Sequence, residues 1–549
     1  MQTMQTLSPS PAPLAFRSSR PVVAAIDIGT NSIHMAIVQV DPSLPAFDII
    51  SREKSTVRLG ERDPKTGDLT EVAMDRAIAA LQRCYDLALS LQVDEVIAVA
   101  TSAVREAPNG RDFLRRVARD VGMKVNAIAG PEEARRIYLG VLSAMELDGK
   151  PHAIIDIGGG STELILGDGR EPLYLSSTKV GAVRLTTEFV RTDPITDMDY
   201  EALRAYARGM LERAVEELHG ELVKHPLADQ LTLVGTSGTA ECLAAIHAAD
   251  TTGYVPSPLQ GCELPLAALR EWVDRLRRMD IEERSTLPEM SDRRAEIILA
   301  GAVVLQEAMD LLGVDRLVVC ERSLREGVIV DWMLQHQLID DRLRFQSSVR
   351  ERSVLALAKK YQVNLPSAEH VAAMALTLFD QTQGLLHNWD DNSRELLWAA
   401  AILHQCGHHV GHDAHHKHAY YLIRHGQLLG YTETEIEVIA NLARYHRKSA
   451  PKKRHEGYQA LAGKRYRQMV DELSAILRLA AALDRRQIQA VRRVQCQFRP
   501  PSREFRLLLE PADRHDDCAI ERWSLDCECP IFETQFSVDL VTIMEPSGC

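Results

Sequence analysis

The chain repeats one pattern of apolar and polar positions in two places. An apolar run is followed by Asp, an apolar residue, Gly, two small residues, Ser and a second apolar run. This pattern forms VVAAIDIGTNSIHMAIVQV (residues 22–40) and HAIIDIGGGSTELILGD (residues 152–168). Short β-branched runs around a tight polar turn are typical of strand–turn–strand hairpins. The repeat predicts two halves of a duplicated domain, each presenting a hairpin turn to one central cleft.

After each hairpin, the periodicity of the apolar positions alternates between strands and helices. Helices are expected over residues 73–91, 110–121, 132–145 and 200–222, and the third of them joins the two halves. Strands are expected in DEVIAVATSAV and in LTLVGTSGT (residues 231–239), the latter ending in a polar turn that enters a helix. This alternation predicts an α/β architecture.

The pattern changes beyond residue 330. Residues 331–482 are expected to be mostly helical and are rich in His, whereas EFRLLLE and FSVDLVTI predict a small strand-containing end. The predicted domains are a disordered tail (1–20), two α/β halves (21–140 and 141–330), a helical domain (331–488) and a small C-terminal domain (489–549).

Composition and charge narrow the class of protein. The 549 residues fit about three or four domains, and no run of eighteen apolar residues predicts a membrane span. The first twenty residues have no apolar core long enough for a signal peptide. Ten scattered cysteines are expected to be reduced thiols, and we expect a cytoplasmic protein. The net charge of −13 argues against a general nucleic-acid coat, and no specific nucleic acid is expected as a partner.

One stretch reverses the overall charge. Between Arg444 and Arg467 there are nine Lys or Arg and one acid, Glu456. Such a stretch is either a solvated basic face or a surface that binds a polyanion by releasing its counterions. We favour the second reading, and we name as the basic strip the six residues Lys448, Lys452, Lys453, Arg454, Lys464 and Arg465.

Three turns are rich in hydrogen-bond donors. A turn without Cβ atoms brings a ligand close to the main chain, and successive N–H groups form a nest for anions. Neither a dinucleotide fingerprint nor a Walker loop is present. Glycine turns can simply close hairpins, but the duplicated pair predicts a phosphate site. The predicted phosphate-binding residues are Gly29, Thr30, Asn31, Ser32, Gly158, Gly159, Gly160, Ser161, Gly235, Thr236, Ser237 and Gly238.

Acids flank these turns. Asp27 and Asp156 end their strands, and Glu163 begins the strand after the triple glycine. Carboxylates beside a phosphate repel it unless a hard cation intervenes, so we expect Mg²⁺, with Mn²⁺ as an alternative ion. Glu132 and Glu133 begin the bridging helix, where acids are common because of the helix dipole. The alternative interpretation is that one of these two glutamates activates the attacking water.

Six segments resemble, in order, those of the exopolyphosphatase/guanosine pentaphosphate phosphohydrolase (Ppx/GppA) family. They are DIGTNSIHMAIV, ATSAVREAPNG, GPEEARRIYLGV, IIDIGGGSTEL, GTSGT and SLREGVIVDW, within roughly residues 20–330. AAILHQCGHHVGHDAHHKHAYYLI and ARYHRK are similar to the later part of the family's longer members.

The resemblance implies an actin-like (sugar kinase/heat-shock ATPase) fold for both halves, an HD-like helical domain and a homodimer. It implies that Glu133 acts on the attacking water, that Arg105 is the arginine of the second motif, and that Asp156 and Glu163 bind the metal. A guanidinium such as that of Arg105 can also grip a phosphate in bidentate fashion.

The chain departs from the family in two places. Glu321–Arg322–Ser323 stands where Asp–Gly–Ala is familiar, which implies a changed local turn. His404–Gln405 stands where a working HD hydrolase has a His–Asp pair, and an amide is a poor ligand for a hard ion. We expect a catalytically silent helical domain that holds substrate or builds a dimer.

Two substrates remain open, namely inorganic polyphosphate, which we favour as an exopolyphosphatase substrate, and guanosine pentaphosphate (pppGpp). A sugar kinase would need an aspartate base in the cleft, and no sugar-kinase signature is present. A non-catalytic polyphosphate or alarmone sensor is the third class.

Overall fold

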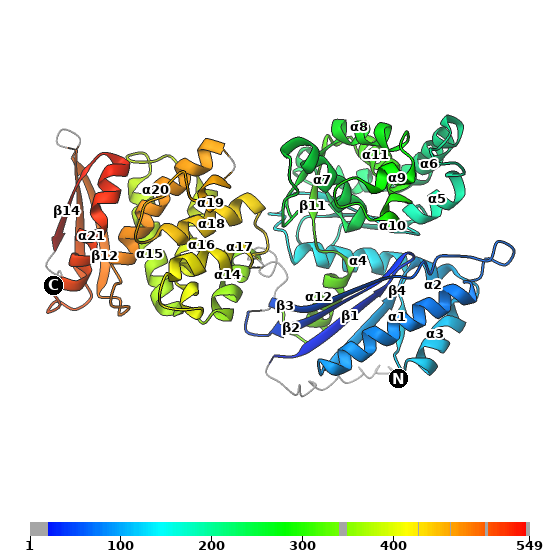
Figure 1. The fold of residues 1–549 in the computed structure, drawn as a ribbon, viewed down its shortest axis with the longest axis horizontal. Coiled ribbons are helices and arrows are strands. Elements are labelled where there is room, and N and C mark those ends of the chain that lie inside the picture. Colours follow the sequence, from blue (N-terminus) through cyan, green and yellow to red (C-terminus); the bar gives the residue numbers. More distant parts are fainter. Residues whose placement is uncertain are drawn as a thin grey trace, which may run out of the picture. The chain divides into compact units, whose positions relative to one another are not determined.

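The computed structural model describes residues 20–44, 46–339, 349–426, 428–461, 463–499 and 503–544. Apart from Arg20, the predicted N-terminal tail lies outside these residues. The chain divides into two compact units, Met1–Val349 and Arg350–Cys549, each of which is described by itself (Figure 1). No helix among the described residues is long and apolar enough to cross a membrane.

The first sheet of the N-terminal unit begins with the predicted hairpin. Strands β1 (Val22–Ile28), β2 (Ser32–Asp41) and β3 (Ala46–Thr56) form an antiparallel meander. Strands β4 (Glu95–Ala100) and β5 (Val125–Ala127) continue the sheet in parallel on the other side of β1, which gives the order β3-β2-β1-β4-β5. The helices of this half are α1 (Glu71–Ser90), α2 (Ser102–Glu106) and α3 (Gly110–Asp120).

The second sheet repeats this topology. Strands β6 (His152–Ile157), β7 (Thr162–Gly167) and β8 (Tyr174–Thr178) form the meander, and β9 (Thr232–Thr236) and β11 (Arg316–Cys320) are parallel to β6. The short β10 (Glu263–Pro265) adds an antiparallel edge. Both β6 and β7 are buried at every position, as expected for central strands covered on both faces. The shared topology confirms the duplicated, actin-like α/β fold.

Helices cover the second sheet in layers that Figure 1 shows in green. Those that pack into its core are mainly α6, α7, α8 and α11. The helices in chain order are α5 (Ala182–Phe189), α6 (Asp197–Leu222), α7 (Ser237–Thr252), α8 (Leu266–Leu276), α9 (Ile281–Ser285), α10 (Asp292–Ala295) and α11 (Ile298–Leu312).

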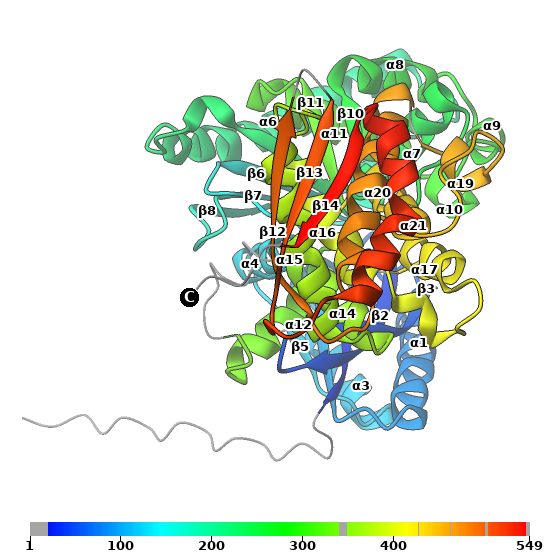
Figure 2. The same ribbon diagram turned by 90° about the vertical axis from the view of Figure 1, so that its left-hand side faces the viewer.

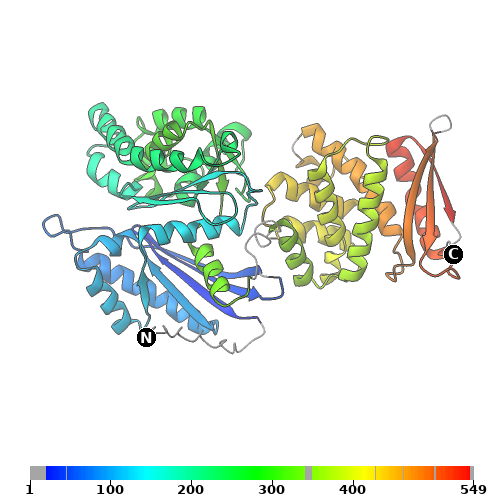
Figure 3. The ribbon, with the colours of Figure 1, turned by 180° about the vertical axis from the view of Figure 1, so that it is seen from behind.

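Two helices join the halves. The bridging helix α4 (Gly130–Leu142) packs against α12 (Leu324–Gln335), which returns from the second half to lie against β1 and β2 (Figure 3, light green). A Cβ on Gly140 would lie 2.0 Å from the Ser323 carbonyl oxygen, and one on Gly327 1.7 Å from that of Arg136. The two glycines therefore permit the close helix contact that fixes the halves around their cleft.

The C-terminal unit is helical and then strand-containing, as expected. Its three strands form the order β12-β13-β14, and α21 packs beside β14 (Figure 2). The long helix α21 was not anticipated. The elements are α14 (Val349–Lys360), α15 (Leu365–Thr382), α16 (Asp391–Leu403), α17 (His415–Arg424), α18 (Glu433–Tyr445), α19 (Glu456–Gln459), α20 (Gly463–Ala482), β12 (Val491–Arg499), β13 (Glu504–Pro511), α21 (Ala519–Phe536) and β14 (Asp539–Met544). The exact domain boundaries, the HD-like character and the homodimer stay predictions.

Candidate active site

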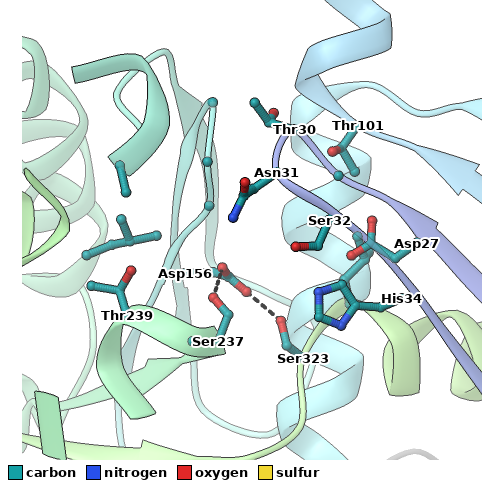
Figure 4. A pocket seen from close by; sticks show the side chains of 18 of the residues that line it. Asp27, Thr30, Asn31, Ser32, His34, Thr101, Asp156, Ser237, Thr239 and Ser323 are labelled. Carbon is teal, nitrogen blue, oxygen red and sulfur yellow. Dashed lines mark hydrogen bonds between the residues drawn. The ribbon is translucent and has the colours of Figure 1, made fainter. Parts of the chain in front are cut away.

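A polar cavity of about 250 Å³ lies between the two halves of the N-terminal unit. The β1–β2 turn (Gly29 to Ser32) and the β6–β7 turn (Gly158 to Ser161) form part of its wall, and the start of α7 brings Ser237 and Gly238. Figure 4 shows Asp27 and Asp156 on opposite sides of this space. The two predicted hairpin tips therefore share one pocket.

The glycines of the second turn permit close contact with the first half. A Cβ on Gly160 would lie 2.2 Å from Ser102 Oγ, and one on Gly159 would lie 3.0 Å from the Thr30 Cβ. Thr30 Oγ1 and Ser102 Oγ are themselves 3.1 Å apart and hydrogen-bonded. These glycines are needed for the approach of the two halves, and not only for the hairpin turn.

Three predicted metal-binding acids line the cavity, and their oxygens differ in how they are engaged. Asp156 accepts hydrogen bonds from the hydroxyls of Ser237 and Ser323, each at 2.5 Å. Glu163 accepts from Ser177 Oγ at 2.7 Å. Asp27 Oδ1 is buried and, within the described part of the chain, has no hydrogen-bond partner.

Burial opposes the charge on these acids. It raises the pKa of Asp27 to about 7, with nearby Glu133 as a further cause, and raises the pKa of Glu163 well above its usual value. The pKa of Asp156 is also raised by burial, although its two serine partners and Arg325 oppose the shift. The acids thus form a site whose ionised state needs a positive charge from a ligand.

The donor set fits Mg²⁺. Among the described residues, no group of three or more His, Cys, Asp or Glu side chains is arranged as a preformed metal cage. Mg²⁺ does not require one, because it usually binds through one or two carboxylates together with phosphate oxygens and water. The unpartnered Asp27 oxygen on the cavity wall is such a carboxylate donor.

Glu133 and Arg105 form an ion pair beside the acids. Arg105 Nη1 donates to Glu133 Oε2 at 2.8 Å and to the Ile128 carbonyl at 2.9 Å. Glu133 lines the cavity, is only 6% exposed and has its pKa raised by burial to about 7. Arg105 is not part of the cavity wall. It therefore reaches the site through Glu133, and its predicted direct contact with phosphate stays a prediction.

Four cavity-lining cations were missed by sequence reasoning, namely Lys54 on β3, Arg293 and Arg294 on α10 and Arg325 on α12. Arg293 donates to the Thr56 carbonyl at 3.4 Å. In the part of the chain that the structure describes, the side chains of Lys54, Arg294 and Arg325 make no hydrogen bond or ion pair. With burial, they lower the pKa of His34 to about 3. Only the fold brings these separate segments together, although Arg325 belongs to the SLREG segment noted above.

The third predicted turn lies only partly at the cavity. Ser237 and Gly238 line it, whereas Gly235 and Thr236 belong to β9 and are not among the lining residues. A Cβ on Gly235 would lie 2.5 Å from Leu317, and Thr236 Oγ1 donates to the Arg322 carbonyl. Close packing against Leu317 therefore explains why a glycine occupies position 235. The phosphate contacts of both residues stay predictions.

A second cavity of about 800 Å³ adjoins the first, and we call it the outer cavity. The two share the wall residues Thr30, Asn31, Ser102, Gly160 and Ile297. Every arginine of the outer cavity is engaged. Arg58 contacts both Glu296 oxygens at 2.7 Å, Arg184 contacts Glu106 at 2.8 Å, and Arg62 donates to the carbonyls of Gly67 and Ala103.

The basic strip lies on the surface of the C-terminal unit. All six of its residues are exposed. Arg465 lies 3.6 Å from Asp390, and within the described ranges the other five make no ion pair. The strip therefore offers unpaired positive charge to a solution anion.

The histidine-rich region nearby contains mainly neutral rings. His404 and His446 are buried, and each ring contacts the carbonyl three residues before it through Nδ1 at 2.6 Å. Burial lowers the pKa of His404 to about 4 and that of His446 well below its usual value. Gln405 accepts from Gln487 Nε2, so the amide that replaces the expected Asp is engaged with another amide.

The fold and the site define a phosphatase that acts on phosphoanhydride bonds, and comparison with known proteins agrees. The sequence profile of the Ppx/GppA phosphatase family matches residues 36–336, and that of Ppx/GppA phosphatase domain III matches residues 349–529. The chain belongs to the Ppx/GppA phosphatase family.

The names of similar proteins include both a guanosine pentaphosphate-type pyrophosphatase and an exopolyphosphatase. A guanosine-5'-triphosphate,3'-diphosphate pyrophosphatase of Photobacterium profundum is 28% identical over 429 residues, which is 78% of this chain and 80% of the relative. That of Vibrio parahaemolyticus is 29% identical over 78% of this chain and 81% of the relative. The crystal structure of an exopolyphosphatase from Cytophaga hutchinsonii is 28% identical, covers 58% of this chain and 98% of its own, and has a TM-score of 0.52.

Proposed function

We propose that the protein is an exopolyphosphatase that releases orthophosphate from the ends of inorganic polyphosphate with the help of Mg²⁺. The observation that supports this most is one cavity in which donor-rich turns, an unpartnered carboxylate, a buried Glu133 and three unpaired cations meet. Phosphoryl transfer relies mainly on positioning and electrostatic stabilisation, and this cavity supplies both.

The chemistry follows from the wall residues. The amides and hydroxyls of the two turns hold the terminal phosphoryl group, and Glu133 accepts a proton from the water that it orients in line with the anhydride bond. Arg105 keeps the Glu133 carboxylate in place. Mg²⁺, held by Asp27 with Asp156 and Glu163 nearby, would offset the charge of the phosphate oxygens. The departing chain end is stabilised by cations of the wall.

Two groups of unpaired cations support polyphosphate as the substrate. Lys54, Arg294 and Arg325 stand ready for the phosphates behind the terminal one, because among the described residues none of them forms an ion pair with a carboxylate. The basic strip offers a further surface for a long polyanion.

The outer cavity favours pppGpp as a second candidate substrate. Its arginines are already paired, so it gives little attraction to a phosphate chain, but its volume suits an uncharged nucleoside. The names of the Photobacterium and Vibrio relatives agree with this candidate.

A substrate panel with one cavity-filling variant tests the proposal. Long-chain polyphosphate, tripolyphosphate, pppGpp and ATP are each supplied with Mg²⁺, Mn²⁺ or no metal, and phosphate release is measured. We expect long-chain polyphosphate to have the highest kcat/KM, and a higher value for pppGpp would overturn the order. Thr187→Trp, on the wall of the outer cavity, should raise the KM for pppGpp on the order of tenfold and leave that for tripolyphosphate unchanged.

A further inference from the structure

The segment Glu321–Arg322–Ser323, which departs from the family motif, is fixed by its own hydrogen bonds. Glu321 Oε1 accepts from the Leu259 amide at 2.9 Å. Arg322 is 5% exposed, donates to Ser143 Oγ at 3.1 Å and stacks over the Phe47 ring. All three replacements therefore make specific contacts.

Ser323 is held at the start of α12 with its hydroxyl directed at Asp156. Its backbone N–H donates to Glu326 Oε2 at 3.2 Å, and its carbonyl accepts from the Gly327 amide at 3.0 Å. The hydroxyl donates to Asp156 Oδ2 at 2.5 Å, as the dashed line in Figure 4 shows. An alanine here would leave this oxygen without that donor.

Asp156 is thereby held from two directions. Ser237 at the start of α7 donates to Oδ1, and Ser323 at the start of α12 donates to Oδ2. Two donors on the two oxygens fix the rotation of the carboxylate, and each oxygen keeps a second lone pair for another ligand. Asp27 lies on the opposite side of the cavity with its unpartnered oxygen (Figure 4).

We propose that Ser323 is a positioning residue which, together with Ser237, holds Asp156 in the orientation that strengthens binding of a divalent cation in the cleft. The proposal rests on the metal dependence of the proposed function. Groups that orient a metal ligand typically change metal affinity by about 10–100-fold when they are removed.

Direct binding of Mn²⁺ to the full chain, followed by electron paramagnetic resonance without substrate, tests the proposal. Ser323→Thr keeps the hydroxyl, and Ser323→Val has the shape of the threonine side chain without its hydroxyl. We expect Ser323→Ala and Ser323→Val to raise the Mn²⁺ Kd on the order of tenfold, and Ser323→Thr to stay within about twofold of the wild type.

Thermal unfolding of each variant separates a structural role from a positioning role. Ser323 is the N-cap residue of α12, and Thr is a good N-cap residue whereas Ala and Val are not, so a merely structural role would lower the Tm of the Ala and Val variants and leave their Mn²⁺ Kd unchanged. An unchanged Kd in these variants, measured on folded protein, overturns the proposal. If Ser323→Val does not fold, Ser323→Ala and Ser323→Thr decide. A wild-type protein that binds no Mn²⁺ also overturns it. Phosphate release from polyphosphate, measured separately, decides the proposed function.

Discussion

Glu132 and Glu133 are adjacent on α4, but their partners differ. Glu132 accepts from Arg135 and Arg136, which lowers its pKa through hydrogen bonds and nearby positive charge. Glu133 is buried on the cavity wall beside Arg105, and its pKa is raised. The residue pattern alone left both as candidates, the family resemblance pointed to Glu133, and their environments favour Glu133 as the residue that acts on water.

We predict that Glu133→Gln lowers kcat by about 10²–10⁴-fold, the usual contribution of a general base. The amide keeps the shape of the side chain, so the fold and the affinity for pyrophosphate should persist in calorimetry. Glu132→Gln is the matched control and should stay within a few-fold of the wild type. Near-normal turnover by Glu133→Gln would remove Glu133 from its proposed role.

The pH dependence follows from the same residue. Glu133 accepts a proton only as a carboxylate, and burial raises its pKa to about 7 in the free protein. The active form is therefore lost as the pH falls through about 7, and kcat/KM should drop by about tenfold per pH unit below it. Stopped assays across pH 5 to 9 measure this. At saturating Mg²⁺, which would hold Asp27 in its ionised form, the residual activity of Glu133→Gln should lack the acid limb, and a limb of equal position in that variant would contradict the assignment.

At the level of elements, hairpins were predictable and long-range packing was not. Apolar runs around Gly29 and Gly159 predict β1–β2 and β6–β7 because the signal is local. The return of α12 to the first sheet depends on close contact at Gly140 and Gly327, and no local pattern reports that contact. Lys54 and Arg294 were missed for the same reason, because they come from β3 and α10, which are far apart in sequence.

The basic strip, which runs from the segment after α18 into the first turn of α20, gives a prediction at this level. Replacing Lys452, Lys453 and Arg454 with Ala should raise the KM for long-chain polyphosphate on the order of tenfold and hardly affect tripolyphosphate, because the short substrate fills the cleft alone. Lys65, Lys124 and Lys150 are exposed in the N-terminal unit, and their triple Ala variant removes the same charge as a control. Equal effects on both substrate lengths would contradict a remote binding surface.

For the whole molecule, a net charge of −13 repels a polyanion at long range, whereas local cations attract it at short range. Salt screens both effects. Screening of the net charge strengthens substrate binding, whereas screening of the local cations weakens it. At 0.1 M salt the screening length is about 10 Å, so the distant net charge is largely screened and contacts with the strip and with Lys54, Arg294 and Arg325 dominate. The sign of the salt effect therefore reports which effect controls substrate binding.

We predict that raising NaCl from 50 to 200 mM at constant free Mg²⁺ increases the KM for long-chain polyphosphate by on the order of tenfold or more. Binding by several lysines and arginines releases counterions, and its affinity falls as a power of the salt concentration. The KM for tripolyphosphate, which contacts fewer cations, should rise less, and the strip variant should show a shallower dependence for the long chain only. A KM that falls with salt would mean that the net negative charge governs binding, and the basic strip would then have no role in binding the substrate.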